Sequence, residues 1–115
     1  MSVSDGFLQF VLEQLEPLGP ITPKPMFGGV GLYARDLFFA ILMRDVLYLK
    51  ADAATRGARE AAGGLPFQPF PDRPRGKAVT QYYSAPMSIL EDGDALLGWA
   101  RQSIAIAGQA KRPRR

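Results

Sequence analysis

The pattern of hydrophobic and polar positions is clearest between Met26 and Lys50, where apolar residues dominate. Two short polar links, Arg35-Asp36 and Arg44-Asp45, interrupt this stretch. Short links between apolar segments favour consecutive antiparallel strands. The middle segment is apolar throughout, which is typical of a strand covered on both faces. We expect strands at Val30–Ala34, Leu37–Met43 and Val46–Lys50.

Three other stretches have the spacing of amphipathic helices. In the first, which follows a capping residue at Ser4 or Asp5, the apolar stripe consists of Phe7, Leu8, Val11, Leu12 and Leu15. The second helix is expected over about Ala53–Ala62, with Asp52 as its cap and Gly63-Gly64 as its stop. Its alanines predict a thin packing face of small residues.

The last helix is expected to begin at Ser88 or Asp92 and to run to about Ala107, where Gly108 is a natural stop. Its position after Pro86 and its apolar periodicity support this assignment. The residues expected to face the core are Leu96, Leu97, Ala100, Ile104 and Ala107, with Trp99 beside them.

Two proline-rich stretches join these elements. Ile21–Pro25 suits an edge strand or an extended lead-in, because proline cannot donate to a ladder. Leu65–Lys77 contains four prolines, and Phe67 and Phe70 are expected to anchor it to the core. A strand over Ala78–Ser84 follows.

The predicted order is helix, three strands, helix, two strands, helix. Short links imply an antiparallel sheet, so the fold class is α+β, in two layers with helices packed on the sheet. The 115 residues fit one domain over residues 1–108, followed by a basic tail over residues 109–115.

Cysteine and histidine are both absent from the chain. Their absence removes thiolate chemistry, the usual general base near neutral pH and the commonest metal ligand. We therefore expect no catalytic residues, no cofactor and no metal, and a protein that is not an enzyme. No apolar run could span a bilayer, and the N-terminus lacks the features of a signal peptide, so a cytoplasmic location is expected.

The glycine-rich segment Gly28-Gly29-Val30-Gly31 invites comparison with phosphate-binding loops. Such loops precede a helix, and the Walker pattern also needs a lysine followed by serine or threonine. Here a strand follows and that lysine is missing. The glycines are better explained by close backbone approach and a bulge or bend at the start of a strand.

Glu91, Asp92 and Asp94 form the tightest acidic cluster. Paired carboxylates can support hydrolysis. These residues lie at a predicted helix start, where negative charge is favoured, so helix capping is the preferred interpretation.

Positive charge is concentrated in two places, although the formal net charge is only +3. Direct binding of nucleic acid through these residues is the alternative function, with Tyr82-Tyr83 as an aromatic contribution. In a strand these two tyrosines point to opposite faces, so at most one belongs to such a surface and the other to the core. The candidate contacts are Arg73, Arg75 and Lys77, near a predicted turn, and Lys111, Arg112, Arg114 and Arg115 in the tail.

A third hypothesis is an enzyme or a small-ligand binder. Its pocket would use Tyr33, Tyr48, Tyr83 or Lys50.

Four segments of the chain resemble the N-terminal domain of the TfoX/Sxy family, in family order and from about Phe7 to Ala107. A basic residue usually precedes the first segment in the family, and Lys24 takes that place with Pro25 between. The segments are Met26–Tyr33, Leu47–Asp52, Tyr82-Tyr83 followed by Pro86, and Leu96–Arg101.

The resemblance implies a small α+β domain and a regulatory role. Sxy-type proteins promote transcription of DNA-uptake (competence) genes together with the cyclic-AMP receptor protein. It thus implies a protein partner, a regulator or part of the transcription machinery, and only indirect contact with nucleic acid. We expect the sheet edge, or the surface around Arg73 to Lys77, to contact that partner. Full-length regulators carry a second, helical domain, which does not follow here, so a stand-alone N-terminal domain is expected. No catalytic residue is carried over.

Overall fold

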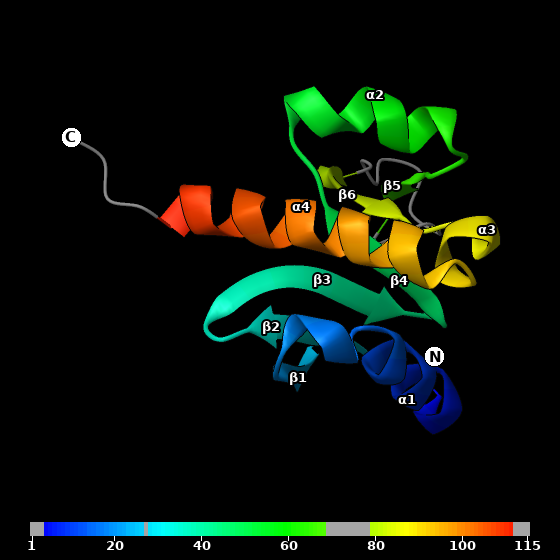
Figure 1. Ribbon diagram of the computed structural model, residues 1–115, viewed down its shortest axis with the longest axis vertical. Helices are drawn as coiled ribbons and strands as arrows, with labels where there is room; N and C mark the ends of the chain where they lie inside the picture. Colours follow the sequence, from blue (N-terminus) through cyan, green and yellow to red (C-terminus); the bar gives the residue numbers. More distant parts are fainter. Residues whose placement is uncertain (1–3, 27, 69–78, 112–115) are drawn as a thin grey trace.

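The computed structural model describes residues 4–26, 28–68 and 79–111, and within them the strands form one antiparallel sheet in the order β1-β2-β3-β4-β6-β5 (Figure 1). This confirms the predicted α+β class. The elements are α1 (Asp5–Gln14), the 3₁₀ helix η1 (Glu16–Leu18), β1 (Ile21–Met26), β2 (Gly29–Ala34), β3 (Leu37–Met43), β4 (Val46–Lys50), α2 (Ala53–Ala61), β5 (Pro66–Phe67), β6 (Val79–Ser84), α3 (Met87–Leu90) and α4 (Gly93–Lys111).

The proline-rich lead-in is a strand at the edge of the sheet. β1 pairs with β2 along its whole length, so four strands precede α2 where the sequence predicts three. Pro23 and Pro25 explain why β1 lies at the edge, since proline is tolerated in a strand that has a neighbour on one side only. They also explain why the sequence allows either an edge strand or an extended lead-in here.

The meander from β2 to β4 follows the prediction closely. In the β3–β4 turn, Arg44 and Asp45 have φ angles of 52° and 57°. Two consecutive left-handed residues are the geometry of a primed hairpin turn, which here forms without glycine. Ser4 donates its backbone N–H to the Asp45 carboxylate at 2.8 Å and ties the start of the chain to this turn.

A bulge where β3 pairs with β2 changes which β3 side chains lie on each face of the sheet. Leu32 is opposite Ala40 and Tyr33 is opposite Phe38, which leaves Phe39 as an extra residue in β3. As a result, Phe39 and Ala40 both pack in the core beneath the helices, whereas Phe38 packs on the other face.

The helix side of the sheet holds the main core. Figure 1 shows α4 lying along β3 and β4. The predicted stripes of α1 and α4 face this core, with Val11, Leu15, Leu96, Ala100 and Ala107 buried. Ser4 caps α1 by accepting a hydrogen bond from the Phe7 amide.

The ends of the last helix differ from the prediction. A short helix, α3, begins after Pro86, and α4 begins separately after Asp92, which accepts a hydrogen bond from the Ala95 amide. The predicted stop at Gly108 is wrong, because α4 continues to Lys111. Packing explains this, since Gly108 lies against the Leu37 side chain on β3 and the helix remains supported there.

The packing of α2 also differs from the prediction. Its start agrees, because Asp52 and Thr55 form a reciprocal capping box. However, its buried residue is Arg59, with only 1% of its surface exposed, rather than a small alanine. Desolvation lowers the pKa of Arg59 to about 10, with the nearby Asp52 opposing the shift.

Neutral groups hold the Arg59 guanidinium in place. Its Nη1 donates to the Leu49 carbonyl at 3.3 Å. Its Nη2 lies within 3.4 Å of the Trp99 carbonyl and the Ser103 hydroxyl, and within 3.3 Å of Gln102 Oε1. The guanidinium carbon lies 4.7 Å from the centroid of the Trp99 ring, a cation–π distance.

The next residue, Glu60, accepts a 2.6 Å hydrogen bond from the Tyr83 hydroxyl. Arg59 and Glu60 therefore connect three of the four family-like segments, those that contain Leu49, Tyr83 and Trp99. Three of the segments that resemble the family are thus the ones that attach α2 to the sheet and to α4.

Candidate binding face of the sheet

The sheet face opposite the main core carries a cluster of aromatic rings, which we call the aromatic face. Its rings contact one another, with centroid distances of 5.1 Å for Tyr33–Phe38, 5.9 Å for Phe38–Tyr82 and 4.8 Å for Tyr48–Phe67. Ile41 and Met43 pack among them. The helices of the described chain all contact the other side, so none of them covers these rings.

Gly29 and Gly31 on β2 belong to this face, and neighbouring atoms occupy the space that a side chain would need at either position. A Cβ on Gly29 would collide with the Leu42 carbonyl oxygen, and one on Gly31 would lie 2.8 Å from the Phe38 ring. Gly28 has a φ of 78°, which favours glycine. The predicted close approach of backbone is confirmed at Gly29, whereas Gly31 is approached by side chains and Gly28 by nothing within 4 Å. The bulge lies further along, beside Tyr33.

Two lysines lie over tyrosine rings of the aromatic face. Lys24 Nζ on β1 is 4.8 Å from the centroid of Tyr33, and Lys50 Nζ on β4 is 5.0 Å from that of Tyr82. Lys50 Nζ also lies 3.5 Å from the Tyr82 hydroxyl. Since β1 and β4 are three strand spacings apart, their backbones are about 14 Å apart across the sheet.

The described strand residues on this face include no carboxylate. Pairing and alternation place on it Thr22, Lys24, Met26, Gly29, Gly31, Tyr33, Phe38, Ile41, Met43, Val46, Tyr48, Lys50, Phe67, Tyr82 and Ser84. Burial and the neighbouring Tyr33 raise the pKa of Tyr82 to about 12, and burial raises the pKa of Tyr48 against the opposing effect of Arg44. Both hydroxyls therefore stay neutral near neutral pH, and the face is cationic.

Tyr82 and Tyr83 point to opposite faces, as predicted, but neither is an exposed ring. Tyr82 is 7% exposed within the aromatic face, and Tyr83 is 1% exposed on the helix side. The hydrogen bond with Glu60, and then burial, raise the pKa of Tyr83. The rings that are half-exposed are Tyr33, Phe38 and Tyr48, which the prediction of a nucleic-acid surface did not include.

The predicted basic contacts lie almost entirely outside the described residues. Arg73, Arg75 and Lys77, with the predicted anchor Phe70, fall in the segment 69–78, and Arg112, Arg114 and Arg115 follow the last described position. Lys111 is the final residue of α4. Their roles stay predictions.

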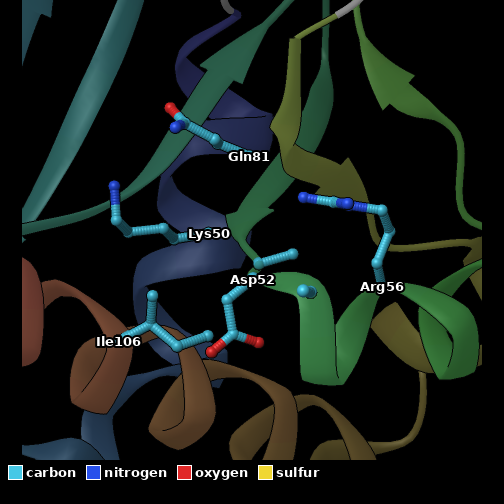
Figure 2. Close-up of a pocket in the computed structure, with 7 residues that line it drawn as sticks. Lys50, Asp52, Arg56, Gln81 and Ile106 are labelled. Carbon is cyan, nitrogen blue, oxygen red and sulfur yellow. The ribbon is translucent and has the colours of Figure 1, made fainter.

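A pocket of about 280 Å³ lies where α2 begins, beside β6 and α4 (Figure 2). Its lining residues are Lys50, Ala51, Asp52, Ala53, Arg56, Gln81 and Ile106. Of the residues expected around a ligand pocket, only Lys50 is among them. Figure 2 shows the charged ends of Lys50 and Asp52 directed away from each other.

Two of the three charged residues that line this pocket, Asp52 and Arg56, are engaged by the chain itself. The Asp52 carboxylate accepts from the Thr55 hydroxyl at 2.9 Å and from its amide at 3.0 Å. These bonds, the hydroxyl first, lower the pKa of Asp52. Arg56 donates from Nε to the Thr80 carbonyl at 3.2 Å. Both residues therefore serve the first turn of α2 and its contact with β6, and the third, Lys50, also belongs to the aromatic face, where its amine lies over Tyr82.

Within the described ranges, no group of three acidic side chains could hold a metal ion, and Asp92 serves as a helix cap, as predicted. None of the helices in those ranges combines the length and apolar character needed to cross a membrane.

Comparison with known proteins finds one family. No curated protein matches the chain. The family model of the TfoX N-terminal domain matches residues 13–107, which include every strand and the cores of α2 and α4. This match covers most of the 115 residues, and the chain belongs to the TfoX N-terminal domain family.

Proposed function

We propose that this protein is a non-enzymatic regulatory module that acts by binding a protein partner. Two observations support the proposal. The chain belongs to the TfoX N-terminal domain family. It also has neither histidine nor cysteine, which are the usual general base and a common nucleophile.

The observation that carries the proposal is two exposed apolar side chains in the segments that flank the β5–β6 pair, Leu65 and Met87, which we call the Leu65–Met87 corner. Leu65 is 68% exposed and Met87 is 63% exposed. The Leu65 amide donates to the Ser84 hydroxyl and its carbonyl accepts from the Ser84 amide, both at 2.9 Å. Large apolar side chains on a backbone held in this way are suited to anchor a partner.

Neither edge of the sheet is a good template for strand addition. β1 contains Pro23 and Pro25, and the opposite edge strand, β5, has only two residues, of which one is Pro66. We therefore assign partner contact to the exposed side chains of the Leu65–Met87 corner and not to a strand edge. Following the family resemblance, we propose a cytoplasmic partner that controls transcription, such as a regulator of DNA-uptake genes.

The test is capture of partners from native lysate at several salt concentrations, with the wild type and with the double variant L65S/M87S. We expect a stoichiometric protein with the wild type and at least tenfold less with the variant. The matched control, A105S, changes an exposed position on α4 and should retain the partner. Failure of the wild type to recover any stoichiometric protein would contradict the proposal.

A further inference from the structure

We propose that the aromatic face binds single-stranded nucleic acid, with phosphates at Lys24 and Lys50 and bases stacked on the half-exposed rings of Tyr33, Phe38 and Tyr48. Its contact residues differ from those of the Leu65–Met87 corner, so this is a second binding activity. It also differs from the basic segments that the sequence suggests for nucleic acid.

Charge is the first argument. The described strand residues of the aromatic face include two lysines and no carboxylate. On the helix side, α1 carries Asp5, Glu13 and neither lysine nor arginine. A phosphate backbone is therefore attracted to the aromatic face and repelled by α1. The separation of about 14 Å between β1 and β4 lets the two ammonium groups meet different phosphates of one strand.

The arrangement of the rings is the second argument. Tyr33 and Phe38 form a stacked pair with an interplanar angle of 28°, and a base can extend such a stack. Tyr48 is held by an edge contact with Phe67. Neighbouring side chains thus fix these rings before a ligand arrives, and aromatic rings accept any base because every base has a π face.

The distribution of apolar groups favours nucleic acid over protein at this face. The large hydrophobic side chains that are exposed in the described chain, Phe10, Leu65 and Met87, belong to no strand of this face. On the aromatic face, Lys24 lies over the half-exposed ring of Tyr33, and a base can displace the ammonium from the ring while the ammonium moves to the adjoining phosphate. Single strands fit better than duplex, whose bases are already stacked on one another.

The test uses fluorescence anisotropy with a labelled oligothymidylate, and with a duplex of equal length, across a salt series. We expect the single strand to bind more tightly than the duplex, with affinity that falls as salt rises. The double variant K24Q/K50Q should bind at least tenfold more weakly at low salt. Its salt slope should be smaller by about 1.4, or about 0.7 for each lost phosphate contact.

A second variant separates stacking from charge. Y33L should weaken binding severalfold and leave the salt slope unchanged, because it removes a ring and no charge. Quenching of tyrosine fluorescence by the oligonucleotide gives an independent readout on the wild type that needs no variant.

Two controls locate the site. R101Q removes a charge from the exposed side of α4 and should leave affinity within twofold. Truncation after Lys111 removes Arg112, Arg114 and Arg115 but spares the helix. The proposal is overturned if the wild type does not bind the single strand, if it prefers the duplex, or if only the truncation abolishes binding. Partner capture uses another probe and variants of other residues, so either result can fail alone.

Discussion

Arg59 and Lys50 are both cations that lie against an aromatic ring, yet they lie on opposite faces of one sheet. Arg59 is 1% exposed and its four hydrogen-bond acceptors are all neutral. Lys50 remains partly exposed, with its amine over Tyr82. The first cation attaches a helix, and the second leaves its charge available at a surface.

This difference extends over the two faces. On the helix side, aliphatic side chains and one desolvated guanidinium exclude water, so each group there contributes to stability. On the aromatic face, the rings and glycines pack against neighbouring residues of the sheet, but several of the rings remain partly exposed to solvent. Substitutions should accordingly reduce stability on the helix side and, at the exposed positions, reduce binding on the aromatic face.

The largest effect is expected for R59A. Truncation removes the guanidinium that donates to the Leu49 carbonyl and to Gln102 Oε1 and that contacts the indole, so we expect a loss of about 2–4 kcal/mol in the free energy of unfolding. The matched control on the same helix, R56A, should cost less than about 1 kcal/mol, because Arg56 is only half-buried. Urea denaturation measures both, and equal losses would remove the contrast.

A comparable effect is expected for G29A on the other face. The added methyl would collide with the Leu42 carbonyl oxygen, which is backbone and cannot rotate away, so we expect a loss of about 2–3 kcal/mol. G31A is the matched variant, because its methyl meets the Phe38 ring and the Met26 sulfur, which can shift. We expect about 1 kcal/mol for it. The reverse order in denaturant unfolding would contradict this account.

A smaller effect is expected for D52A, which removes the cap of α2 and should cost about 1 kcal/mol. The pKa of Asp52 is lowered in the folded protein. Its contribution is therefore present above the ordinary value of 3.8 and disappears as pH falls through the folded pKa. Melting temperatures of D52A and wild type should differ near neutral pH and converge in acid; a constant difference would argue against the cap.

The smallest effect concerns Tyr82 in alkaline solution. Its pKa is raised from 10.0 to about 12, so the fold favours the neutral phenol. That contribution is complete below pH 10.0 and is lost as pH rises toward about 12, because the unfolded chain ionises first. In a tyrosinate absorbance titration, Y82F should lack the step with the highest pKa. Persistence of that step would show that another tyrosine is the most protected.

Local patterns in the sequence account for most of the fold. The stripe of α1, the Asp52 cap and the three strands of the meander are all recognisable, because each depends on residues within a few positions of one another. β1 was ambiguous, because its prolines permit either an edge strand or a lead-in until a neighbour is known.

The candidate sites were less predictable. Nothing in the sequence marks Arg59 as buried, since an arginine in an alanine-rich helix usually faces water. Its burial depends on acceptors from β4 and α4, at positions 49 and 99–103. Likewise, the sequence marks Gly108 as the end of the last helix. The Leu37 side chain that supports the helix at Gly108 lies on β3, far away in the sequence, so local patterns do not reveal it.

By itself, the sequence determined the order of the elements, the absence of histidine and cysteine chemistry, and membership of the TfoX N-terminal domain family. Only the tertiary structure decided which residues meet on each face. Because Phe39 is an extra residue in β3, Phe38 lies on the aromatic face while Phe39 and Ala40 both lie in the main core. Strand pairing places Lys24 and Lys50 on the same side of the sheet. Side-chain alternation is local, but the register that gives it a direction is set by distant strands.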